Sequence, residues 1–97
     1  MKAYVLGWHI GEFGLCVDHI PNDLSWIEKA RRASDNLPVM MVGHKVGGRG
    51  RPDRLEFSAK SARSLRRLVP RLRRIGSMSM TLVKGDGPVV AKLPLRA

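Results

Sequence analysis

The sequence is poor in cysteine and in long apolar runs. Its 97 residues include one cysteine, Cys16. A single thiol cannot form an intramolecular disulfide, so the fold must depend on its core, and a reducing, cytoplasmic setting is expected. No apolar run approaches the roughly 20 residues of a membrane span. Gly7, His9 and Glu12 interrupt the N-terminal apolar stretch. We therefore expect neither a signal peptide nor membrane association.

Residues that support catalysis or metal binding are also scarce. The three histidines, His9, His19 and His44, lack the close spacing of a structural zinc site. His9, Cys16 and Asp18 would share one face of a hairpin, so a thiol nucleophile with a histidine base is a possible alternative. We expect no cofactor and no enzymatic activity. Aromatic residues make up 5% of the chain, and their apolar positions favour core packing over base stacking.

Acidic residues are few, and they are unevenly placed. Eighteen lysines and arginines stand against eight acids, giving a net charge of +10. Residues 1–48 carry five cations and five acids, whereas residues 49–97 carry thirteen cations and three acids, so the whole excess lies in the second half. Such polarisation favours a polyanionic partner. A surface charged only for solubility is the alternative.

Apolar patterning predicts one α+β domain over residues 1–97. The expected order is ββαββαββ, an antiparallel sheet of up to six strands with two helices on one face. A turn at Gly11-Glu12 would place Ile10 opposite Phe13, with Phe13 and its alternate neighbours facing the core. The expected elements are strands at 2–10 and 13–20, a helix within 21–36, strands at 37–46 and 54–58, a helix within 59–76, and a hairpin at 78–95.

Glycines recur at an offset of 36 residues. Gly7, Gly11 and Gly14 correspond to Gly43, Gly47 and Gly50. Two explanations remain open at this point. One is a tandem ββα repeat with units 4–36 and 40–76, followed by the third hairpin at 78–95. The other is the general need of hairpin turns for glycine.

The second predicted helix is amphipathic. Its leucines cluster on one side at 100° per residue, while arginines fill the opposite arc without any acid. Pro70 should kink this helix or split it. A solvated charged face usually mixes signs, and a membrane-surface helix favours bulky aromatics on its apolar face. A phosphate-contacting face fits better. The outward arginines are Arg63, Arg66, Arg67, Arg71, Arg73 and Arg74.

The stretch Arg49-Gly50-Arg51-Pro52 resembles an AT-hook, a motif whose arginines lie along the minor groove of A/T-rich DNA. The resemblance covers these four residues only, and Asp53 follows where such motifs continue with basic residues. The resemblance implies a hairpin tip that enters the minor groove. Glycine permits close approach of the backbone, and arginine is attracted by the strong negative potential of the groove. A loop that only touches phosphates, or is merely flexible, remains the alternative.

These features predict a small basic protein that binds nucleic acid through phosphates. Double-stranded DNA is favoured because of the Arg49–Arg54 tip, and RNA remains possible. The alternative is an inhibitor or adaptor, of the kind found in phages and mobile elements, that binds an acidic protein or a nucleoprotein complex. The sequence does not indicate an oligomeric state. The predicted contacts are Lys45, Arg49, Arg51, Arg54, Arg63, Arg66, Arg67, Arg71, Arg73 and Arg74.

Overall fold

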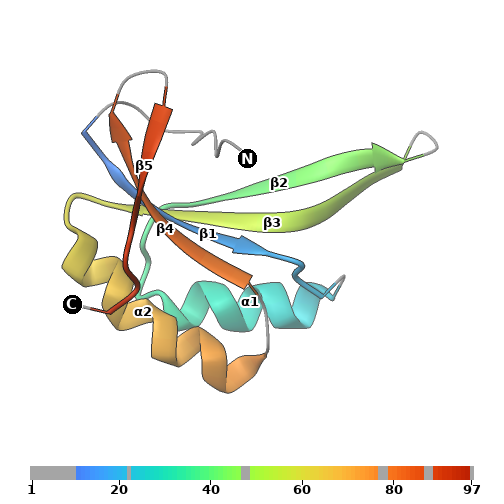
Figure 1. Ribbon diagram of the computed structural model, residues 1–97. Helices are drawn as coiled ribbons and strands as arrows, with labels where there is room; N and C mark the ends of the chain where they lie inside the picture. Colours follow the sequence, from blue (N-terminus) through green and yellow to red (C-terminus); the bar gives the residue numbers. More distant parts are fainter. Residues whose placement is uncertain (1–10, 22, 47–48, 77–78, 87–88, 97) are drawn as a thin grey trace.

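Five strands and two helices make up the described part of the chain (Figure 1). The computed structural model describes residues 11–21, 23–46, 49–76, 79–86 and 89–96, and for 44–46, 49–52, 86 and 89 the description covers the backbone. The elements are β1 (Phe13–Asp18), α1 (Leu24–Ala33), β2 (Val39–Val46), β3 (Arg49–Ala59), α2 (Ala62–Ile75), β4 (Ser79–Asp86) and β5 (Val89–Leu93).

The strands form one antiparallel sheet in the order β2-β3-β1-β4-β5. β3 lies between β1 and β2, and β1 lies between β3 and β4, so each helix connects two strands that are separated by a third. This is the split β-α-β topology of the ferredoxin-like fold, extended here by β5. Both helices cover the same face of the sheet (Figure 1). The predicted class, an α+β fold with an antiparallel sheet and two helices on one face, is confirmed.

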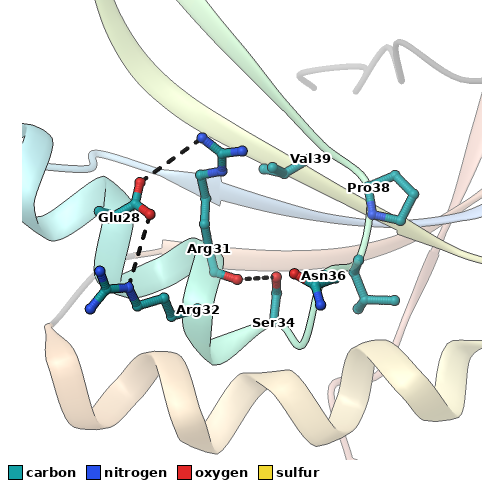
Figure 2. Close-up of a pocket in the computed structure, with 8 residues that line it drawn as sticks. Glu28, Arg31, Arg32, Ser34, Asn36, Pro38 and Val39 are labelled. Atoms are coloured by element: carbon teal, nitrogen blue, oxygen red, sulfur yellow. Dashed lines mark hydrogen bonds and ion pairs between the residues drawn. The ribbon is translucent and has the colours of Figure 1, made fainter.

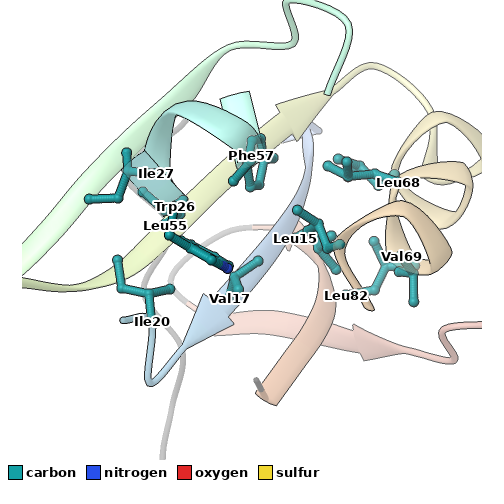
Figure 3. Packing of buried hydrophobic residues seen from close by; sticks show 13 residues of the cluster. Leu15, Val17, Ile20, Trp26, Ile27, Leu55, Phe57, Leu68, Val69 and Leu82 are labelled. Carbon is teal, nitrogen blue, oxygen red and sulfur yellow. The ribbon is translucent and has the colours of Figure 1, made fainter. Parts of the chain in front are cut away.

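The main core lies between the sheet and the helices. Alternation along the strands turns Leu15, Leu55, Phe57 and Leu82 toward the helix layer. Leu68 of α2 closes over them, as Figure 3 shows. Figure 3 also shows Trp26 and Ile27 of α1 packing on the same cluster from the β3 side. Burial of these apolar side chains is the main stabilising contribution to the fold of a chain with no disulfide.

The predicted hairpin partner of β1 is wrong. Phe13–Asp18 pairs along one edge with β3, from Ala59 to Arg54, and along the other with β4, from Lys84 to Ser79. A strand has only two edges, so neither remains for the predicted pairing of Ile10 with Phe13. The predicted strand at 2–10 lies outside the described residues. The predicted core face of β1 is confirmed, because Leu15 and Val17 are fully buried in the core.

Two glycine-rich stretches that were predicted as turns belong to strands. β3 begins at Arg49, and the pairs Val46–Arg49, Lys45–Gly50, His44–Arg51 and Gly43–Pro52 extend the β2–β3 ladder. The register shifts between Val42 and Gly43, which marks a β-bulge beside Asp53. Likewise β4 continues through Gly85 to Asp86. The distal part of β2–β3 projects from the body as a two-stranded arm (Figure 1).

Local capping determines where the helices begin and end. The Asp23 carboxylate accepts a hydrogen bond from the Ser25 backbone N–H at 2.9 Å, so Asp23 is the N-cap of α1. Asp35 and Asn36 follow α1 with positive φ angles of 52° and 67°, a conformation that these two residue types tolerate. Ser61 caps α2.

Pro70 does not split α2, which continues from Ala62 to Ile75 with Pro70 exposed. Neither described helix combines the length and apolarity needed to cross a membrane.

Candidate nucleic-acid interface

The outer side of α2 carries a row of unpaired cations. Arg63, Arg67, Arg73 and Arg74 are exposed, and they make no ion pair or hydrogen bond with the described residues. We call these four residues the α2 basic face. Arg63, Arg67 and Arg74 recur at intervals of four and seven positions, so they form one row about 16 Å long. The opposite side of α2 buries Leu65, Leu68, Val69 and Leu72.

The other two predicted arginines of α2 have structural partners. Arg66 is half-buried and donates Nε–H to the Pro94 carbonyl at 3.1 Å, which ties the segment after β5 to α2. Arg71 donates to the Ala33 carbonyl at 3.2 Å and pairs with the Asp35 carboxylate at 2.5 Å. A guanidinium at the end of α1 also interacts favourably with the helix dipole. Both arginines therefore contribute to folding in a way that the amphipathic pattern alone did not reveal.

α1 adds one cation that the sequence analysis missed. The side of α1 next to α2 is identified by two contacts, the Trp26 indole N–H with the Ile75 carbonyl at 3.0 Å and the Ala33 carbonyl with Arg71. Lys29 follows Trp26 by three positions and precedes Ala33 by four, so it lies on the same side and is exposed. The spacing of Trp26, Lys29 and Ala33 in the sequence shows that they share one side of a helix. Only the packing of α1 against α2 shows that this side borders the α2 basic face.

Arg54 lies in the sheet and its guanidinium is engaged by acids. Its Nε is 2.7 Å from Asp18 on β1 and its NH1 is 3.4 Å from Glu56, and only 24% of its side chain is exposed. Burial is the largest single effect on the pKa of Arg54 and lowers it, but the hydrogen bond and charge interaction with Asp18, together with smaller contributions from Cys16 and Glu56, raise the pKa above its ordinary value. Arg54 therefore does not belong to an exposed tip, and we leave it out of the interface.

The remaining predicted cations, Lys45, Arg49 and Arg51, belong to the arm. Their backbone is paired in the β2–β3 ladder, with Lys45 opposite Gly50 and His44 opposite Arg51. The AT-hook-like stretch Arg49–Pro52 is thus part of a strand near the end of a projecting hairpin, and only residues 47 and 48 separate β2 from β3. The structure does not bring the arm and the α2 basic face together, because the arm projects from the sheet edge, whereas α2 packs on β1, β3 and β4 within the body of the sheet (Figure 1).

The sheet face away from the helices is not suited to stacking bases. In β1 and β3 this face carries Cys16, Asp18, Arg54, Glu56 and Ser58, with no aromatic side chain. Most of these side chains are also buried. RNA-binding sheets of similar topology present exposed aromatics on their central strands. Trp26 and Phe13 pack against the core on the helix side, as their apolar positions in the sequence led us to expect.

Cys16 lies in a setting that suppresses thiolate formation. It is fully buried beside Val83. Burial, with a smaller contribution from Glu56, raises the pKa of the thiol to about 12. A nucleophilic cysteine needs the thiolate, so this environment does not favour the alternative of a Cys16-dependent enzyme. His9 lies outside the described residues. Within the described ranges, no three potential ligand side chains are grouped to hold a metal ion.

A shallow depression of about 320 Å³ lies between α1 and the start of β2 (Figure 2). Figure 2 shows Glu28 between the guanidinium groups of Arg31 and Arg32. Its carboxylate oxygens lie 4.0 Å from the Arg31 nitrogen and 3.9 Å from the Arg32 nitrogen. The Ser34 hydroxyl donates to the Arg31 carbonyl at 2.6 Å and so closes the end of α1. These polar groups pair with one another, as in ordinary surface ion pairs. The mixed charge distinguishes this side of α1 from the α2 basic face.

Comparisons of the chain with protein-family models, with curated proteins and with solved structures gave no match. The functional argument therefore rests on the geometry and charge of this chain.

Proposed function

We propose that this protein binds nucleic acid by contacting phosphates through the α2 basic face. The observation that carries the proposal is a row of exposed arginines without acidic partners in the described residues, on a helix whose sequence has no acid. Guanidinium groups bind phosphate oxygens in bidentate geometry, and they do so better than lysine. Lys29 extends the positive surface onto α1.

Double-stranded DNA is the favoured ligand. This preference depends on the AT-hook resemblance of Arg49–Pro52, which the projecting arm would carry toward a groove as β-arm proteins do. Phosphate contacts themselves carry little sequence information. We therefore expect α2 to supply affinity for duplexes of any sequence, and the arm to supply any preference for A/T-rich sites.

A salt series tests the electrostatic part of this proposal. Electrophoretic shifts with duplex DNA, single-stranded DNA and RNA are measured at increasing salt. With about four to six phosphates neutralised, log affinity should fall linearly with log salt, with a slope of about −4 to −5 on duplex DNA. A slope near zero, or no shift at low salt, would refute nucleic-acid binding.

Charge reversal tests the location of the interface. Arg63→Glu with Arg67→Glu places acids in the first half of α2, where the helix dipole tolerates them, so stability should stay within about 0.5 kcal/mol. Binding should be almost abolished. Lys84→Glu with Lys92→Glu changes the net charge equally, but on β4 and β5, and should weaken binding far less. Equal losses for both variants would mean that net charge, rather than α2, determines binding.

The same basic face would also suit an acidic protein. A pull-down from lysate with and without nuclease distinguishes the two partners. Loss of the captured material after nuclease treatment supports nucleic acid. A protein that is retained by the parent chain after nuclease treatment, but lost with the Arg63→Glu/Arg67→Glu variant, supports the adaptor or inhibitor alternative.

A further inference from the structure

The two edges of the sheet differ in how well they are protected against further pairing. β5 forms one edge and has several features that discourage it: it is short, it carries exposed Lys92, and Pro94 follows it. Short strands, lysine and proline are common protections of natural sheet edges. The segment after β5 also turns onto α2, where Arg66 holds the Pro94 carbonyl.

The β2 edge lacks such protection over Val39–Gly43. This five-residue stretch has no charged residue and no proline. Among the described strands, only β3 pairs with β2, so no described strand occupies the N–H and C=O groups of its other edge. Met40 and Met41 are 38% and 60% exposed on this strand. An apolar edge with open hydrogen-bonding groups is a template for another strand.

We propose that β2 pairs antiparallel with β2 of a second copy of this chain, centred on Met41. The pairing would place Met41 opposite its own symmetry mate and Val39 opposite Gly43, joining the two five-stranded sheets into one. A twofold axis perpendicular to the sheet relates the copies, so the interface is self-complementary. Met41 is opposite Leu55 in the register and therefore lies on the helix side of β2, where two Met41 side chains would meet.

The distribution of charge favours a second copy at this edge over the other surfaces. A protein of net charge +10 must keep its cations apart when it self-associates. Near β2 the flank of α1 carries both signs, because Glu28 lies between Arg31 and Arg32. The depression of about 320 Å³ bounded by these residues and Val39 would face the partner.

The same symmetry keeps the two α2 basic faces apart. The β1 strands of the two copies would be separated by five strand spacings, about 24 Å, and α2 packs on β1 and on its two neighbours β3 and β4. Both helix layers would lie on one side of the joined sheet. The dimer does not require the proposed nucleic-acid binding, but it would present two α2 basic faces to one polyanion.

Sedimentation measures the association directly. Nuclease-treated protein at high salt, which excludes bridging by nucleic acid, is examined over a range of concentrations. The parent chain should show a concentration-dependent monomer–dimer equilibrium. Met41→Lys sets like charges opposite each other and should raise the dissociation constant about tenfold or more. Ala91→Lys is the matched control, since Ala91 is exposed on β5, and should leave the constant unchanged.

Cross-linking provides a second measurement. Met41→Cys should give a covalent dimer with a short thiol-reactive linker, whereas Ala91→Cys should not, and buried Cys16 should stay unmodified in the folded protein. A parent chain that remains monomeric at every concentration overturns the proposal. So does a dimer that Ala91→Lys disrupts and Met41→Lys leaves intact. Loss of binding with the Arg63→Glu/Arg67→Glu variant concerns the proposed function alone and should not alter the dimer.

Discussion

At the scale of single residues, the environment determines what each arginine does. Arg54 and Arg67 are identical in chemistry and both were predicted to contact a ligand. In the structure Arg54 holds Asp18 and Glu56 within the sheet, whereas Arg67 is exposed on α2. The Glu56 side chain is only 2% exposed, and a buried carboxyl group is costly unless cations or hydrogen-bond donors lie beside it.

Replacing Arg54 should therefore affect folding. Arg54→Met preserves much of the side-chain volume but removes the guanidinium from two carboxylates, one of them buried. We expect the free energy of unfolding to fall by about 3 kcal/mol, measured by urea denaturation. Arg67→Met is the matched control and should change it by less than about 0.5 kcal/mol. Similar values for the two variants would show that the Arg54 ion pairs do not stabilise the sheet.

Cys16 predicts a loss of stability in alkali. Its ordinary pKa of 9.0 rises to about 12 in the folded protein. Between these values the unfolded chain loses the thiol proton while the folded chain keeps it. The contribution of the protonated Cys16 thiol to the free energy of unfolding is therefore complete below about pH 9. It is lost as the pH rises toward 12, at up to about 1.4 kcal/mol per pH unit.

The Cys16→Ala variant isolates this contribution. The difference in unfolding free energy between parent and variant is compared from pH 8 upward, as far as folding stays reversible, so that pH effects common to both proteins cancel. The difference should narrow as the pH rises. A difference that is independent of pH would show that the thiol is not the titrating group.

At the scale of elements, α2 joins a core face and a charged face in one helix. Leu72 is fully buried and adjacent to Arg73, which is exposed. At the ends of the helix pair, Trp26 binds the last residue of α2 and Arg71 binds the last residue of α1. The two helices thus support each other, and the α2 basic face is presented on a fixed scaffold.

Substitutions at neighbouring positions of α2 should separate stability from binding. Leu72→Ala opens a cavity in the core and should cost about 2–5 kcal/mol of unfolding free energy. Arg73→Ala should cost less than about 1 kcal/mol, the scale of a helix-dipole interaction, and should weaken nucleic-acid binding. Thermal denaturation and shift assays read the two effects. A stable Leu72→Ala variant would show that the faces of α2 are assigned wrongly.

At the scale of the whole molecule, size would limit the length of duplex that one copy contacts under the proposed function. The longest extent of the protein is 33 Å, close to the roughly 34 Å of one duplex turn. We expect affinity per copy to reach a plateau at duplexes of about one turn, measured by fluorescence anisotropy with duplexes of increasing length. A steady gain in affinity well beyond two turns would indicate a larger assembly than the monomer or the proposed dimer.

Much of the architecture follows from local patterns in the sequence. Alternating apolar residues predicted β1 and its core face, helical spacing predicted α1 and α2, and the leucine and arginine arcs of α2 were visible in the sequence. These predictions agree with the structure because the spacing of apolar residues depends on which side of a strand or helix is buried. The turns were harder to place, since glycine and proline near Arg49–Pro52 and Lys84–Asp86 permit a turn without requiring one.

The order of strands and the roles of individual charges were decided only by the tertiary structure. The sequence around β1 offers other apolar segments as pairing partners. Only the crossover of both helices over one face of the sheet places β3 and β4 at the two edges of β1. That crossover brings Arg54 beside Asp18, 36 positions away, and Arg71 beside Asp35, also 36 positions away. The sequence by itself determined the net positive charge and the amphipathic character of α2, since both are properties of composition and short spacing. Which arginines remain free for a ligand depends on long-range neighbours, and these are fixed only when the sheet assembles.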